Sequence, residues 1–277
     1  MTIDEITKEA ASALGVKVKR EVAQGGQKAV LEVVASDGTP MALKVVLLGG
    51  PHSDAARERA AREVELLASI HSEFVVRVTS KLVELGSPVR GIAWLEEWLS
   101  GADLWKTGAG WSWGDAMEMA RDVARGLVAF HEKKVVHRDL SPGNVQKTSD
   151  GSYKIIDPGL ARHLQKATMT GLFQPGTPGF MSPEHVTSGA RPLPASDVFC
   201  VGVLLYFVLT GQPPVVFNGD YEDYAERLRR VEMISLEDRV ASLPVDAYEV
   251  VGRCLDRQSA RRFIDGAELF QALESIK

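Results

Sequence analysis

Cysteine and excess positive charge are both scarce in this sequence. Its two cysteines, Cys200 and Cys254, are too few and too far apart for a disulfide framework or a zinc site. We therefore expect both to pack as small apolar side chains of a reduced, intracellular protein. The net charge is −5, and because phosphate backbones select basic surfaces, nucleic acid is not an expected partner.

Long apolar segments are also missing. Residues 1–13 are mixed in charge and lack the apolar core of a signal peptide. The longest apolar stretch, around 198–209, is shorter than the ~20 residues of a membrane-spanning helix. We therefore expect a cytoplasmic protein with no membrane anchor in this sequence.

The composition that remains is that of a globular protein, with 45% hydrophobic and 25% charged residues. A chain of 277 residues buries a substantial core without a metal or disulfide staple. It exceeds the ~100–200 residues of a usual domain, so one large unit or two cooperating units fit.

The first third of the chain predicts strands and one helix. Residues 18–48 alternate polar and apolar side chains, which is typical of strands joined by turns. Over 53–70 the apolar spacing becomes helical, and Ser53 can cap the start. Two more strands are expected, near 74–85 and 89–96.

The remainder of the chain has a mainly helical pattern. Residues 115–132 carry an apolar stripe at helical spacing, and a strongly apolar helix is expected over 197–210. Short strands are expected around Val145 and over 153–156, and a Gly/Pro-rich loop over about 171–195.

A sheet-rich beginning followed by helices predicts an α+β protein of two lobes. We place a small β-rich N-lobe with one main helix at 1–99 and a larger, mainly helical C-lobe at 100–277. Their junction is expected near 97–103, and the two lobes together form one domain.

Four short motifs, in chain order, match what phosphoryl transfer from ATP requires. The reaction needs a cation on the phosphates, oxygen ligands for magnesium and an acceptor beside the attacking hydroxyl. Residues 41–44, Met-Ala-Leu-Lys, end a strand with a lysine, and Glu63 on the following helix can pair with it. The segment 137–144 reads His-Arg-Asp-Leu-Ser-Pro-Gly-Asn, and 157–159 reads Asp-Pro-Gly after a short apolar run.

With these motifs the chain resembles the eukaryotic-type (Hanks-type) protein kinases, in particular their bacterial serine/threonine members. The resemblance runs from about 18 to 275. The segment 176–184 looks like the family's substrate-binding segment, 197–206 like its buried central helix, and Arg262 like the arginine that pairs with Glu184. The resemblance implies the bilobal protein-kinase fold and transfer of the γ-phosphate of ATP to serine or threonine of proteins.

The same resemblance implies a role for each motif residue. Asp139 would orient or accept the proton of the substrate hydroxyl, and with Lys44 and Asn144 it forms the expected catalytic set. Lys44 would hold the α- and β-phosphates, while Asn144 and Asp157 would bind Mg²⁺. The residues implied for the ATP site are Val22, Gly25, Gly26, Val30, Ala42, Lys44, Glu63, Glu97 and Leu99.

Four positions depart from the family pattern. The glycine-rich loop, residues 23–30, keeps only the second of three glycines, Gly25. Ser141 stands where a lysine usually neutralises the γ-phosphate, and Pro158 replaces the phenylalanine of Asp-Phe-Gly. Glu96 stands at what looks like the family's gatekeeper position, where an apolar residue is commoner and a carboxylate must find a donor or be partly wet. Because the catalytic and metal-binding residues remain, we expect an active enzyme at a reduced rate.

Two alternatives stay open at this point. The departures also fit a pseudokinase, a nucleotide-binding scaffold without turnover. The segment 139–144 resembles the Asp-Leu-x-Pro-Gly-Asn of aminoglycoside phosphotransferases, small-molecule kinases of the same fold that also lack the lysine. Arg138 and the segment 176–184 favour a protein kinase. Thr177 favours serine/threonine specificity, because in the family this threonine contacts the catalytic aspartate.

A regulatory hypothesis follows from the arginine before the catalytic aspartate. In kinases with that arginine, here Arg138, a phosphate on the activation loop often docks against it. Thr168 and Thr170 lie in that loop near Lys166 and Arg162, where a phosphate could order the loop. We therefore expect autophosphorylation at one or both threonines, for which two copies of the chain could form a dimer. The sequence does not name the substrate proteins.

Overall fold

The computed structural model describes residues 2–25, 27–49, 53–158, 162–163 and 176–276. They form two compact units, the first made of residues 1–71 and 75–100 and the second of residues 72–74 and 101–277. Several positions for which the sequence predicts a role lie outside the described residues: Gly26, Gly159, Lys166, Thr168 and Thr170.

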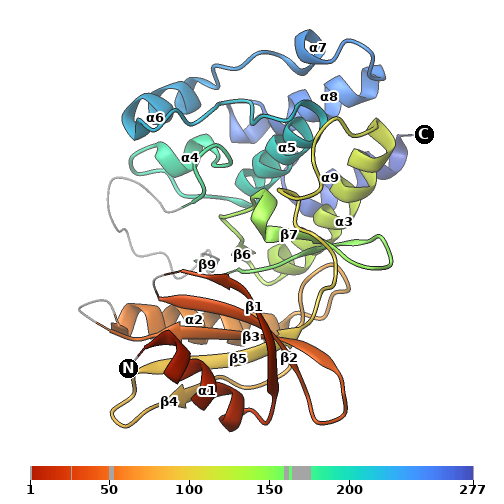
Figure 1. The fold of residues 1–277 in the computed structure, drawn as a ribbon. Coiled ribbons are helices and arrows are strands. Elements are labelled where there is room, and N and C mark those ends of the chain that lie inside the picture. The colour runs from red at the N-terminus through yellow and green to blue at the C-terminus, as the bar shows by residue number, and fades with distance from the viewer. Residues whose placement is uncertain (1, 26, 50–52, 159–161, 164–175, 277) are drawn as a thin grey trace. The chain divides into compact units, whose positions relative to one another are not determined.

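The first unit is built on a five-stranded antiparallel sheet in the order β1-β2-β3-β5-β4 (Figure 1). Its strands are β1 (Lys17–Gln24), β2 (Lys28–Val34), β3 (Pro40–Leu47), β4 (Val83–Leu85) and β5 (Gly91–Glu97). The strands predicted from the alternation of residues 18–48 are therefore confirmed.

The strand predicted over 74–85 is wrong for most of its length. Only its last residues form β4, and before them the chain makes isolated bridges at Val75 and at Val78, the latter with Glu96. Here the carbonyl of Phe74 accepts a hydrogen bond from the N–H of Ile155, whereas the N–H of Thr79 donates to the carbonyl of Leu95. These backbone hydrogen bonds run to two different neighbours and not along one strand, so the segment is a packed loop.

Helix α2 (Ser53–Ser69) covers one face of the sheet, close to the bounds predicted for it. It buries Ala60 and Val64 against Ile92 and Trp94 of β5. The side chains of Ala93 and Leu95 alternate with these two and point to the opposite face.

Helix α1 (Ile3–Ala13) packs on that opposite face and was not predicted. Figure 1 shows α1 and α2 on the two sides of the sheet. Ile6, Ala10 and Ala11 of α1 share one buried cluster with sheet residues, among them Ala93 and Leu95. Both hydrogen bonds of a capping box between Thr2 and Glu5 start the helix, and this Thr-x-x-Glu pattern was the signal available in the sequence.

The second unit is mainly helical (Figure 1). Its helices are α3 (Trp113–Glu132), α4 (Pro183–Val186), α5 (Pro194–Thr210), α6 (Tyr221–Arg230), α7 (Leu236–Arg239), α8 (Val245–Cys254) and α9 (Gly266–Ser275), with 3₁₀ turns η1 (Pro142–Asn144) and η3 (Ser259–Arg261). Two short antiparallel ribbons pair β6 (Val135–Val136) with β9 (Arg162–His163) and β7 (Val145–Lys147) with β8 (Tyr153–Ile155). The α+β class is therefore confirmed.

Helix α5 is the centre of this unit. It is buried from Ala195 to Leu209, which agrees with an apolar character on all sides. It starts earlier than predicted because Pro194, whose fixed backbone suits a first helical turn, begins it. Cys200 of α5 and Cys254 of α8 are buried free thiols. None of the helices in the described part of the chain is both long and apolar enough to cross a membrane.

The contact between α1 and the sheet is testable by truncating Ile6, which is fully buried. We expect Ile6→Ala to lower the free energy of unfolding by about 2–5 kcal/mol, because the change leaves a cavity against β5. Urea unfolding followed by circular dichroism measures this, with the exposed Lys8→Ala on the same helix as control. An unchanged midpoint for Ile6→Ala would contradict the packing of α1 on the sheet.

Candidate active site

Lys44 lies in the middle of β3, and its cross-strand neighbours are Val30 of β2 and Trp94 of β5. Its side chain is 6% exposed. The Nζ atom lies 2.9 Å from Oε1 of Glu63 on α2 and 2.8 Å from Oε1 of Glu96 on β5. The pairing of Lys44 with Glu63 is therefore confirmed, whereas its contact with Glu96 was not predicted.

The buried carboxylate of Glu96 has two donors within the sheet. Glu96 is 2% exposed. Its Oε1 accepts a hydrogen bond from the indole Nε1 of Trp94 at 2.9 Å in addition to the contact with Lys44. Both partners lie on β3 and β5 themselves, so the sheet provides this environment.

The other residues expected at a nucleotide lie along the same sheet. Ala42 is two positions from Lys44 and Val30 is directly opposite it, so the three share one face. Gly25 closes the turn after β1 with a 2.8 Å hydrogen bond from its N–H to the carbonyl of Lys28. Val22 of β1 is exposed.

Glu97 and Leu99 lie at the end of β5 and just after it. The N–H of Glu97 donates to the carbonyl of Arg77 at 2.9 Å, and its Oε1 accepts from the N–H of the same arginine at 2.9 Å. Leu99 is buried. The chain that leaves the sheet is thus anchored on both the backbone and the side chain of Glu97.

In the second unit, Asp139 is held by two polar partners. Its Oδ1 accepts hydrogen bonds from the hydroxyl of Thr177 at 2.7 Å and from the N–H of Thr177 at 2.9 Å. Its Oδ2 accepts from Nδ2 of Asn144 at 3.2 Å, and that nitrogen also donates to the carbonyl of Asp139 at 2.8 Å. The expected contact between Thr177 and Asp139 is therefore confirmed.

The two expected metal ligands lie at the same end of the β7–β8 ribbon. Val145 pairs with Ile155, and the N–H of Ile156 donates to the carbonyl of Asn144 at 2.9 Å, which places Asp157 next in line. The backbone of Asp157 has a φ of 53°. The ribbon therefore brings Asn144 and Asp157 to one edge, although they are far apart in the sequence.

The chemistry of these two side chains fits a magnesium ion. The amide nitrogen of Asn144 faces Asp139, so its amide oxygen is the atom left to bind a cation. Amide and carboxylate oxygens are ligands of Mg²⁺, which usually takes further oxygens from substrate phosphates and water. Among the residues described, no group of three or more His, Cys, Asp and Glu side chains is placed to hold a metal alone.

A fully buried carboxylate, Asp197 of α5, holds the segment that leads into Asp139. Its oxygens accept from the N–H groups of His137 at 2.8 Å and Arg138 at 2.9 Å. Nε2 of His131 lies 3.0 Å away, and it donates because Nδ1 of the same ring accepts from the N–H of Gly266. Burial would raise the pKa of Asp197, but these partners, His131 first, hold that pKa below its ordinary value.

His185 of α4 holds the same segment from a different element. Its Nε2 lies 2.9 Å from the carbonyl of Arg138, and its Nδ1 lies 2.8 Å from the hydroxyl of Ser182. A carbonyl only accepts, so Nε2 carries the proton and Nδ1 accepts from the serine. Burial, and then the nearby charge of Arg138, lower the pKa of His185. The ring therefore acts as a neutral bridge between α4 and Arg138.

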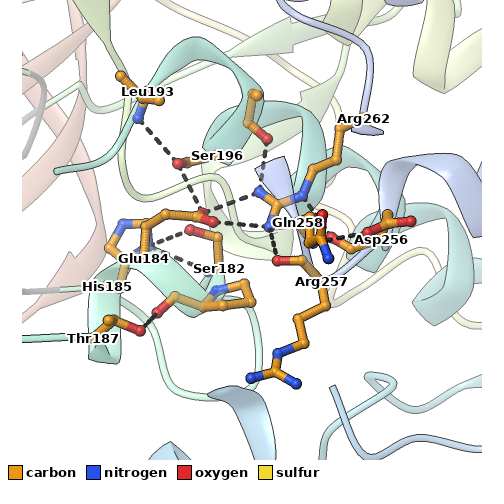
Figure 2. Close-up of polar contacts among 12 residues, drawn as sticks. Ser182, Glu184, His185, Thr187, Leu193, Ser196, Asp256, Arg257, Gln258 and Arg262 are labelled. Carbon is orange, nitrogen blue, oxygen red and sulfur yellow. Dashed lines mark hydrogen bonds and ion pairs between the residues drawn. The ribbon is translucent and has the colours of Figure 1, made fainter. Parts of the chain in front are cut away.

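The expected pairing of Glu184 with Arg262 is confirmed (Figure 2). Nη2 of Arg262 lies 2.9 Å from Oε1 of Glu184, and Nη1 lies 3.0 Å from Oε2, so the pair is bidentate. The hydroxyl of Ser196 also donates to Oε2 at 2.9 Å. Burial would raise the pKa of Glu184, but the hydrogen bond and charge of Arg262 keep it below the ordinary value.

The buried histidines make acid stability a test of this arrangement. Burial is the main cause that lowers the pKa of His137 and His185 in the folded chain from the ordinary 6.5. The unfolded chain binds these protons more readily, so the free energy of unfolding should fall as pH drops below 6.5. Urea midpoints at about pH 7.5 and 5.5 measure this. We expect a smaller pH dependence for His185→Gln, and an equal dependence would contradict the buried, neutral state of His185.

Comparison with known proteins agrees with this geometry. The sequence model of the family described as "Protein kinase domain" matches residues 16–271. The chain is 32% identical over 238 residues to "Probable serine/threonine-protein kinase PkwA" of Thermomonospora curvata, covering 84% of this chain and 30% of that protein. It is 30% identical over 271 residues to "Serine/threonine-protein kinase pkn2" of Myxococcus xanthus, covering 93% and 32%.

A third relative, "Serine/threonine-protein kinases drp72" of Corynebacterium efficiens, is 34% identical over 168 residues, covering 58% of this chain and 30% of that protein. The chain thus spans about a third of the length of these relatives. The family match begins just before β1 and ends within α9, so it includes nearly all of both units. On this evidence, the chain belongs to the protein kinase domain family.

Proposed function

We propose that this chain transfers the γ-phosphate of ATP to serine or threonine residues of proteins. The observation that carries the proposal is the carboxylate of Asp139, which Thr177 and Asn144 hold while Asp197 holds the backbone before it. Membership of the protein kinase domain family supports proteins rather than small molecules as acceptors. The names of three relatives support serine and threonine as the modified residues.

The hydrogen bonds of Asp139 suit an acceptor that orients an incoming hydroxyl. An ionised carboxylate offers about four lone-pair sites. Two groups of Thr177 and one N–H of Asn144 occupy three of them. The remaining site would accept a hydrogen bond from the substrate hydroxyl, align its oxygen with the phosphorus, and take its proton as the new O–P bond forms.

Each unit has residues to which we assign a part in binding, with the nucleotide-binding set mostly in the first unit and the metal ligands in the second. The family uses ATP and a divalent metal in general, and we propose Mg²⁺, held by Asn144 and Asp157. A bound Mg²⁺ would supply positive charge to the phosphates. Lys44, paired with Glu63, would hold the α- and β-phosphates. The proposed contacts with the rest of the nucleotide are Val22, Gly25, Gly26, Val30, Ala42, Glu97 and Leu99.

We make four further proposals about the chain's regions, location, partners and autophosphorylation. We assign ATP binding to 1–99 and catalysis and substrate binding to 100–277. We also propose a cytoplasmic location, no nucleic acid partner, and autophosphorylation within a dimer. Thr168 and Thr170, the sites expected for autophosphorylation, lie outside the described residues.

A pseudokinase is the second candidate function. The observation that favours it is Ser141, which is buried at the start of η1 where the family pattern has a lysine. A neutral side chain there supplies no charge to the γ-phosphate. The intact contacts around Asp139 favour turnover, so we place the pseudokinase second.

Substituting the proposed acceptor separates these two candidates. We expect Asp139→Asn to lower kcat for phosphoryl transfer by about 10²–10⁴-fold, because the proton acceptor is lost. The Kd for ATP should change little. Transfer of labelled phosphate to a protein acceptor, with magnesium present, measures the first, and calorimetry measures the second. Asp150→Asn, an exposed aspartate between β7 and β8, is the matched control.

A kcat of Asp139→Asn equal to that of the unsubstituted protein would contradict the assignment of Asp139 as the proton acceptor. Absence of transfer by both proteins, with ATP bound by both, would identify a pseudokinase.

The hydroxyl of Thr177 gives an independent test of how Asp139 is held. We expect Thr177→Val to lower kcat by about tenfold, because the carboxylate loses one hydrogen bond worth roughly 1.5 kcal/mol. The KM for ATP should stay unchanged, and Thr177→Ser should recover most of the activity because it keeps the hydroxyl. Steady-state kinetics of the three proteins measure this, and equal loss in both variants would contradict the role of the hydroxyl.

A further inference from the structure

Lys44 lies between two buried carboxylates in the first unit. Its Nζ is 2.9 Å from Oε1 of Glu63 and 2.8 Å from Oε1 of Glu96. The side chains of the lysine and the two glutamates are 6%, 5% and 3% exposed. One ammonium group thus faces two buried carboxylates.

The two carboxylates are held by different parts of the unit. Glu63 reaches Lys44 from α2, whereas Glu96 belongs to β5, which pairs with β3 along its whole length. The indole of Trp94 donates to Glu96 at 2.9 Å, and its ring centre lies 5.7 Å from the ammonium of Lys44. The position of Glu96 therefore depends on the sheet and not on α2.

This arrangement limits what Lys44 can offer to a phosphate. An ammonium group has three donors, and two of them face carboxylates, so at most one remains for any other partner. A phosphate that approaches Lys44 must therefore compete with a carboxylate already in place.

We propose that Glu96 competes with the phosphates of the nucleotide for Lys44. In this proposal Glu96 is an affinity-determining residue that weakens binding of ATP and ADP but leaves binding of the unphosphorylated nucleoside unchanged. The inference rests on the proposed function only in assigning the nucleotide phosphates to Lys44. It does not require that the phosphate is transferred.

Glu96→Gln tests the proposal, because glutamine keeps the size of the side chain and an acceptor for Trp94 while it removes the charge. Calorimetry with MgATP, ADP and adenosine gives three values of Kd. We expect those of MgATP and ADP to fall about tenfold, the size expected for one charge-assisted hydrogen bond of Lys44 that the phosphate no longer shares with Glu96. The Kd of adenosine should stay within about twofold.

Two further variants sharpen the result. Glu84→Gln is the matched control, since Glu84 of β4 forms an exposed ion pair with Arg57 of α2 and does not contact Lys44. It should leave all three values of Kd unchanged. In a Lys44→Met background most of the gain from Glu96→Gln should disappear, because the group that Glu96 and the phosphates share is gone.

Four results would each overturn the proposal. The first is a Kd of MgATP that is unchanged or higher in Glu96→Gln, and the second is a Kd of adenosine that falls as much as that of MgATP. The third is a full fall in the Kd of MgATP in the Lys44→Met background, and the fourth is no nucleotide binding by either the unsubstituted protein or Glu96→Gln. If circular dichroism shows that Glu96→Gln is unfolded, Glu96→Met replaces it with the same expected gain.

Measuring both nucleotide binding and phosphoryl transfer with these proteins distinguishes a failure of this inference from a failure of the proposed function. Tighter MgATP binding by Glu96→Gln without any phosphoryl transfer would remove the kinase assignment and leave the competition standing. Phosphoryl transfer with an unchanged Kd would do the reverse.

Discussion

The buried carboxylate of Asp197 is the contact on which the candidate catalytic site of the second unit depends. It lies in the first turn of α5, where the helix dipole favours a negative charge, and it has no exposed surface. Two backbone N–H groups and His131 satisfy it, so the cost of burying the charge is offset by hydrogen bonds to the segment that precedes Asp139. The apolar helix α5 thus positions the polar loop that carries Asp139.

The backbone of Arg138 in that loop has a φ of 72°, a conformation that residues other than glycine rarely adopt. The loop therefore needs contacts that hold it. Asp197 binds the N–H of Arg138, and His185 binds its carbonyl. His185 follows Glu184 directly, and Arg262 holds that glutamate from beyond η3. Helix α5, helix α4 and the segment after η3 are distant in the sequence, and together they hold Asp139 and its neighbours in place.

Partners that both belong to motifs of the family were predictable from the sequence, whereas partners outside those motifs were not. Three pairs were predicted and are confirmed: Lys44 with Glu63, Asp139 with Thr177, and Glu184 with Arg262. Helix α1 was missed although its capping box was visible, and a strand was wrongly predicted where buried valines line a loop. The contact of Glu96 with Lys44 depends on the register between β3 and β5. The contact of His185 with Arg138 joins residues 47 positions apart. No local sequence pattern predicts either contact.

The central claim is that this chain moves phosphate from ATP to serine or threonine. The most direct measurement is tandem mass spectrometry of the protein and of a mixture of acceptor proteins after incubation with magnesium and ATP. The account predicts phosphoserine or phosphothreonine that is absent when ATP is replaced by ADP. Calorimetric binding of ATP without any phosphorylated residue, on the chain or on the acceptors, would contradict it.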